Sequence, residues 1–174
     1  REQSGPAGGV RGVDIHLRSI DSTFTSAQGA TPIGINGASG GGEVNVQSHP
    51  RVASGANGKL FIVWQNEGAS GKIYGRTFTP TGSVLGNQQE LSSGTSNISP
   101  DVCATPNGFI ATWQSGADIK VRVVGSDGTP AGADQTVNDL PSSTDAHPQI
   151  AALEDGRFAV VWVSGTQGKG DIYV

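Results

Sequence analysis

The stretch HPRVASGANGKLFIVW, residues 49–64, decides the fold because it recurs twice further along the chain. The other copies are PDVCATPNGFIATW at residues 100–113 and HPQIAALEDGRFAVVW at residues 147–162. The tryptophans that end the copies, Trp64, Trp113 and Trp162, are 49 residues apart in both steps. A fixed period of this size indicates stacked copies of one supersecondary unit.

Each copy opens with a predicted β-hairpin. A glycine follows the proline by eight residues and is preceded by Asn or Asp, as in Asn57-Gly58, Asn107-Gly108 and Asp155-Gly156. This pair between apolar runs is typical of a type I′ turn. The second strand, for example residues 60–64, is apolar on both faces, so we expect it to be covered from both sides.

Two further strands complete the predicted unit. Residues 72–78 and 118–124 alternate between apolar and polar side chains, and weaker fourth strands follow near 88–91 and 135–138. The sequence therefore predicts an all-β fold of tandem four-stranded antiparallel blades, a β-propeller or a propeller-like array. Hairpins of this kind also occur in two-sheet sandwiches, and the period favours the propeller.

The ends of the chain carry partial copies, which leave the terminal blades incomplete. We divide the single domain, 1–174, into units at about 11–49 (with a Gly-rich insertion), 50–99, 100–147 and 148–174. An open strand edge is a template for another chain, so we expect these edges to pair with copies of this chain or with further repeats of a longer precursor. The expected edge residues are Asp14, Ile15, His16, Leu17, Arg18, Asp171, Ile172, Tyr173 and Val174. The sequence contains no methionine, even at position 1, so we expect it to be a piece of a longer precursor.

Composition excludes several classes of partner. The 27 glycines, with only 15% charged residues, are typical of a turn-rich β protein. A net charge of −4 with scattered Lys and Arg argues against a nucleic-acid partner. No stretch approaches the roughly 18 apolar residues of a membrane span, so we expect no membrane insertion. The single cysteine, Cys103, takes a position that alanine fills in the other copies and is predicted to be a small buried residue.

Candidate binding residues are few. The polar residues just after the tryptophans are weak candidates for contacts with glycans, whereas the tryptophans themselves are expected to pack between blades as the repeat core. Arginines in the third strands, Arg18, Arg76 and Arg122, are expected to pair with a carboxylate or to stack on Trp or Tyr. The candidates after the tryptophans are Gln65, Asn66, Gln114 and Ser115.

Motifs for catalysis and metal binding are not found. The sequence contains no Gly-x-Ser-x-Gly elbow and no close pair of acids suited to glycosidase work. The acidic turns at 126–128 and 154–156 hold too few carboxylates for a calcium loop. His49 and His147 precede the repeat proline and are interpreted as part of the strand entry. We therefore expect no enzyme activity and no cofactor. Calcium stays open as an alternative that no motif supports.

The repeat as a whole resembles a known kind of sequence. The pattern of the repeat is similar to repeats of large bacterial secreted and surface proteins. It covers residues 11–174 and reads Pro-x-Val-Ala, then Asn/Asp-Gly, Phe-x-Val-x-Trp and Ile-x-x-Arg. The resemblance implies propeller-like blades, an extracellular or cell-surface location, and structural or adhesive roles. Together with the open edges it predicts a non-enzymatic scaffold that assembles head to tail into a filament or ring. The alternative is a carbohydrate-binding, lectin-like propeller or adhesin module.

Overall fold

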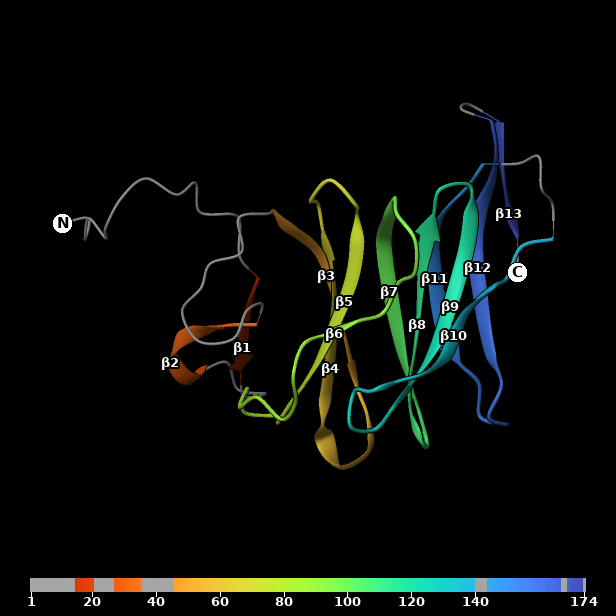
Figure 1. The fold of residues 1–174 in the computed structure, drawn as a ribbon. Helices are drawn as coiled ribbons and strands as arrows, with labels where there is room; N and C mark the ends of the chain where they lie inside the picture. Colours follow the sequence, from red (N-terminus) through yellow and green to blue (C-terminus); the bar gives the residue numbers. More distant parts are fainter. Residues whose placement is uncertain (1–14, 21–26, 36–45, 140–143, 167–168, 174) are drawn as a thin grey trace, which may run out of the picture.

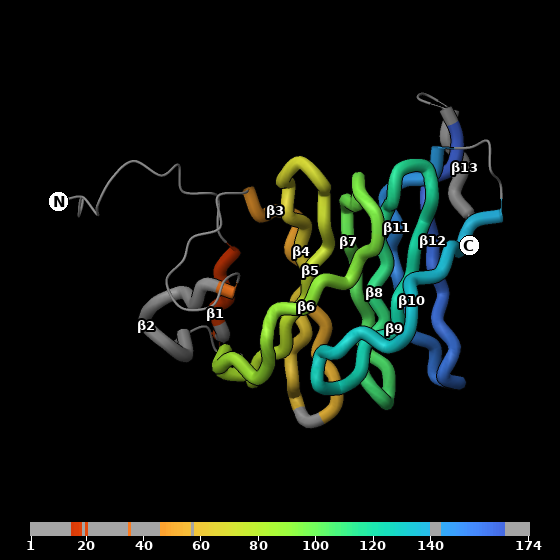
Figure 2. The backbone as a smooth tube through the Cα atoms, viewed as in Figure 1, coloured from red at the N-terminus to blue at the C-terminus, as the bar shows by residue number. Residues whose placement is uncertain are grey.

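The computed structural model describes residues 15–20, 27–35, 46–139, 144–166 and 169–173. Its strands form four antiparallel sheets, here called sheets A to D, which stand in a row (Figure 1). The chain passes along the row in sequence order, from the N-terminal sheet to the C-terminal one (Figure 2). Among the described residues no helix has the length and apolarity needed to cross a membrane.

Each sheet is built from strands that are consecutive in the chain. Sheet A holds β1 (His16–Ile20) and β2 (Ala27–Gly34). Sheet B holds β3 (Gln47–Ser54), β4 (Leu60–Asn66), β5 (Lys72–Phe78) and β6 (Gln89–Glu90), with a short 3-10 turn at Ala56–Gly58. Sheet C holds β7 (Asn97–Thr105), β8 (Gly108–Ser115), β9 (Asp118–Gly125) and β10 (Pro130–Thr136). Sheet D holds β11 (Asp145–Ala152), β12 (Phe158–Thr166) and β13 (Lys169–Tyr173).

The prediction of an all-β fold with four-stranded antiparallel sheets is confirmed by sheets B and C. The predicted type I′ turn needs positive φ at both central residues, and it is wrong in the second and third hairpins because Asn107 and Asp155 do not have positive φ. In the third hairpin, Gly156 N donates to Leu153 O at 3.2 Å and Leu153 N donates to Arg157 O at 2.8 Å. Only the glycine is left-handed, with φ +86°, because a three-residue loop uses an ordinary turn followed by one glycine bulge.

Apolar layers between adjacent sheets form the core. Phe61 of sheet B stacks on Phe109 of sheet C, with ring centroids 4.9 Å apart. This arrangement explains why β4 and β8 are apolar on both faces, since sheets B and C each lie between two neighbouring sheets. Sheet D ends the row, and β12 packs against sheet C on one side. The layer between sheets A and B contains Ile15, Ile35, Ile62, Trp64 and Phe78; the next contains Phe61, Val63, Ile73, Leu91, Val102, Phe109, Ala111, Trp113 and Val124; the last contains Cys103, Ile110, Ile119, Val121, Ile150 and Val160.

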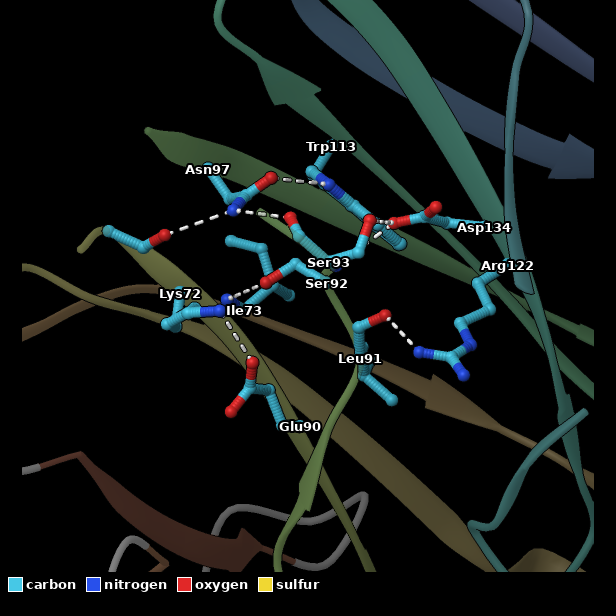
Figure 3. Close-up of polar contacts among 11 residues, drawn as sticks. Lys72, Ile73, Glu90, Leu91, Ser92, Ser93, Asn97, Trp113, Arg122 and Asp134 are labelled. Carbon is cyan, nitrogen blue, oxygen red and sulfur yellow. Dashed lines mark hydrogen bonds and ion pairs between the residues drawn. The ribbon is translucent and has the colours of Figure 1, made fainter. Parts of the chain in front are cut away.

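Two of the third-strand arginines hold the fourth segment of their own sheet. Arg76 Nε donates to Gly86 O at 2.7 Å, and Arg122 Nε donates to Gly132 O at 3.1 Å. Arg122 Nη1 also donates to Leu91 O at 2.7 Å and so ties sheet C to sheet B (Figure 3). These hydrogen bonds go to backbone carbonyls, whereas the prediction named a carboxylate, Trp or Tyr as the partner. Arg76 also lies over the ring of Phe78, with Cζ 5.9 Å from the ring centroid.

Candidate functional site

The first strands of sheets B, C and D carry the same irregularity. In β3 the pairs Ser48–Gln65 and Arg51–Val63 flank a β-bulge in which His49 and Pro50 both lie opposite Trp64. The ladders of β7 and β11 are interrupted in the same way, opposite Trp113 and Trp162. Proline suits this position because it has no N–H to contribute to a ladder. The repeated Pro and Trp of the sequence are thus the two sides of one bulge.

The residue before each bulge proline has an unusual backbone conformation. φ is +51° at His49, +52° at Ser99 and +53° at His147. Positive φ is uncommon outside glycine, and a following proline disfavours helical conformations further. Such a conformation costs about 1–3 kcal/mol and clusters at functional sites. This conformation occurs at the same position in three copies, which makes the bulges candidates for a functional site.

The three bulges converge. β3 lies against β7, and β7 lies against β11, so equivalent residues of the three sheets meet. They line a hollow of about 200 Å³, here called the bulge hollow. Its lining is polar and mostly accessible, with two imidazoles, a guanidinium, an amide and a hydroxyl. The lining residues are His49, Arg51, Ser99, Pro100, His147, Pro148 and Gln149.

Asp101 links the three first strands beside this hollow. It occupies the position in β7 that Arg51 has in β3 and Gln149 has in β11. Asp101 Oδ2 accepts from Ile150 N at 2.9 Å, and Oδ1 lies 3.9 Å from Arg51 Nε. One carboxylate therefore contacts both neighbouring sheets and holds the lining of the hollow in place.

The residues after the tryptophans take different places. Gln65 is buried, and its Oε1 accepts from Ser99 N at 3.1 Å, so it supports the bulge of the next sheet. Asn66 is also buried, and its Oδ1 accepts from Gly68 N at 3.0 Å. Gln114 is partly buried and donates from Nε2 to Gly116 O at 3.0 Å, and Ser115 is partly buried at the end of β8. None of the four lines the bulge hollow.

The other predicted residues lie away from the hollow. Trp64 and Trp113 are fully buried between sheets, and Trp162 is partly buried. Cys103 is buried between sheets C and D, where burial raises the pKa of its thiol. Among the expected edge residues, Ile15 is buried, Leu17 partly buried, and His16 and Arg18 exposed. Asp171, Ile172 and Tyr173 form part of β13, whereas Asp14 and Val174 lie outside the described residues.

The described residues contain no group of three or more His, Cys, Asp or Glu side chains that could hold a metal ion. The acidic turns have local partners instead. Asp127 accepts hydrogen bonds from Thr129 N and Thr129 Oγ1, and these bonds lower the pKa of Asp127. Asp155 accepts in the same way from Arg157, and its pKa is also lowered.

No family model matches the sequence, and no curated protein matches it. A solved structure does. The fold resembles that of an endo-arabinase. The enzyme is from Bacteroides thetaiotaomicron, and the likeness has a TM-score of 0.53 at 18% sequence identity. It covers 82% of this chain, which spans 59% of the length of that enzyme. At this identity the likeness concerns the fold.

The comparison corrects the functional prediction. A non-enzymatic scaffold that assembles head to tail was expected, but the structural neighbour is an enzyme, an endo-arabinase. The prediction weighed sequence motifs along the chain, whereas the residues that line the bulge hollow come from three distant segments. The prediction of no enzyme activity is overturned by the same finding.

The sequence did contain a signal for the hollow. His49, Ser99 and His147 all precede the repeat proline, and side chains at one position of successive first strands meet. The histidines were interpreted only as strand entries. Asp101, Arg51 and Gln149 were missed because their residue types differ between copies, although their position in the repeat is the same.

The strain at the bulges is testable by substitution with glycine. Because glycine adopts positive φ freely, His147→Gly is expected to leave stability unchanged or raise it by up to about 1 kcal/mol. Gln149→Gly, two residues further along the same strand, is expected to lower stability by about 1 kcal/mol. Urea unfolding of both variants measures the difference. Equal losses in the two variants would show that His147 is not strained.

Proposed function

We propose that this chain forms consecutive blades of a β-propeller in a carbohydrate-active enzyme, and that the bulge hollow holds a sugar unit of the substrate. The proposal rests on the convergence of three strained bulges on one polar hollow. The fold likeness to an endo-arabinase supports the class of substrate, a polysaccharide. A propeller arrangement agrees with sheets that stack face to face and share a line of adjacent first strands.

The lining suits a polyhydroxylated ligand. Arg51 supplies donors, His49 and His147 supply ring nitrogens, and the Gln149 amide supplies both donor and acceptor. Glycosidic cleavage uses two carboxylates on either side of the bond. We assign one of them to Asp101, which contacts the lining from β7. We assign no residue to the second carboxylate.

Binding and cleavage are tested together with the purified chain and a panel of polysaccharides that includes arabinan. We expect retardation of the wild type in affinity electrophoresis. The double change Arg51→Ala with Gln149→Ala should weaken binding about tenfold or more, because it removes two side chains that bond the ligand. Lys59→Ala is the matched control, since Lys59 lines a separate hollow near the turns of the first hairpins.

Cleavage is followed as release of reducing ends. Asp101→Asn should abolish release while leaving the fold intact, because an amide oxygen still accepts from Ile150 N. A wild type that neither binds nor cleaves any polysaccharide would contradict the proposal. Binding that is insensitive to the Arg51 and Gln149 changes would contradict the assignment to the bulge hollow.

A further inference from the structure

The bulge at His49 carries a chain of side-chain hydrogen bonds that the other two bulges lack. Ser48 Oγ donates to Glu67 Oε1, and Ser48 Oγ lies 2.8 Å from His49 Nδ1. The equivalent residue before His147 is Ala146, which has no hydroxyl. The chain Glu67–Ser48–His49 therefore distinguishes His49 from the second histidine of the hollow.

Proton counting along this chain assigns the tautomer of His49. A serine hydroxyl has one proton, and here it is directed to the Glu67 carboxylate. The same oxygen must then accept from His49, so Nδ1 carries the ring proton. Nε2 of the neutral ring is left as an acceptor, and no described residue bonds it.

Glu67 is well placed to hold this arrangement. Its backbone N donates to Val46 O at 2.8 Å, which extends the pairing of β3 and β4 by one step. The following turn is closed by the bond from Gly68 N to Asn66 Oδ1. On the other side of His49, Arg51 donates from Nη1 to Pro50 O at 3.0 Å. His49, the hydrogen-bond acceptor, and Arg51, the donor beside it, are thus both anchored to the bulge.

We propose that Glu67, acting through Ser48, fixes His49 as a hydrogen-bond acceptor. The bulge hollow then selects a ligand that donates from a hydroxyl group to His49 Nε2 and accepts from Arg51 with a neighbouring oxygen. Adjacent hydroxyl groups of a sugar ring meet this requirement. A fully deprotonated inorganic anion such as sulfate does not, because it has no proton to give to Nε2. His49 contacts the ligand in this scheme, and Ser48 and Glu67 are positioning residues. The ligand part of the inference rests on the proposed function, and the tautomer part does not.

The tautomer is tested without any ligand. The chain has three histidines, so the ring nitrogens of His49 can be assigned in long-range ¹H–¹⁵N spectra. We expect protonated Nδ1 at His49 in the wild type and a shift toward protonated Nε2 in Ser48→Ala and Glu67→Ala. Ser48→Thr should retain the wild-type pattern. Ser54→Ala, on the same strand, and the signals of His147 are the controls. An unchanged His49 spectrum in both alanine variants would overturn the inference.

The ligand part is tested with arabino-oligosaccharides and their O-methylated forms, which cannot donate. Wild type is expected to prefer the free hydroxyl form at least tenfold, and Ser48→Ala should lose most of this preference. Comparing the ratio between the two proteins removes the steric effect of the methyl groups. A tautomer that shifts while the preference stays the same would overturn the selection by His49. A wild type that binds neither sugar, with the tautomer fixed as expected, would contradict the proposed function instead.

Discussion

Asn97→Ala is expected to lower the free energy of unfolding by about 3–5 kcal/mol, because it leaves several buried polar groups without partners. Asn97 is fully buried, and its Oδ1 accepts from Trp113 Nε1 at 3.0 Å. Its Nδ2 donates to Gly71 O at 3.0 Å and to Ser93 O at 3.1 Å (Figure 3). One side chain thereby joins the tryptophan of sheet C, a loop of sheet B and the segment that links the two sheets.

Urea unfolding measures this loss. Asn107→Ala, at an exposed turn, is the control and is expected to stay within about 0.5 kcal/mol of wild type. Trp113→Phe keeps most of the ring and removes the N–H, so in the double variant the two losses should be less than additive. Full additivity would show that the bond between Asn97 and Trp113 contributes little, and an Asn97→Ala loss below about 1 kcal/mol would contradict the prediction.

Gly108→Ala should destabilise the protein by about 3 kcal/mol or more, because backbone atoms leave no room for a side chain. A Cβ atom at Gly108 would lie 2.2 Å from Val124 O and 2.9 Å from Gly125 C, both in β9. φ at Gly108 is +156°, which side chains also disfavour. Since β8 and β9 are paired along their length, neither strand can move without breaking the ladder.

The equivalent glycine of sheet D provides a matched control. Gly156 has φ +86°, and a Cβ there would meet nothing within 4 Å. Gly156→Ala should therefore cost only the left-handed penalty, about 1–2 kcal/mol. Thermal and urea unfolding of the two variants should differ clearly. Similar losses would show that the close approach to Val124 does not determine the cost.

The repeat predicted much of the fold because its signals are local. Residues 72–78 alternate and form β5 with the expected bounds, and the strand that begins at residue 60 is β4. The turn type could not be predicted, since Asn-Gly and Asp-Gly fit both a two-residue loop and a three-residue loop with a glycine bulge. The choice depends on how many residues pair beyond the turn, which the sequence does not specify.

The candidate site was harder to predict because it depends on how the sheets are placed. A residue before proline is expected to be extended, so nothing in the sequence indicated positive φ at Ser99. Gln65 was a candidate ligand by position, yet it supports Ser99 from inside the protein. The contact of Ser48 with Glu67 joins residues 19 apart, and it exists only because β3 and β4 are paired.

The bulges separate two tasks within each repeat. His49, Ser99 and His147 have no partner across the strand, so their side chains contribute to the hollow and not to the pairing of the sheet. A tryptophan lies opposite each of them and a proline follows each, and the bulge is the same with His as with Ser. The position before the bulge proline therefore accepts different residue types, His in two copies and Ser in one. Under the proposed function, changing these three residues is expected to alter what the hollow recognises.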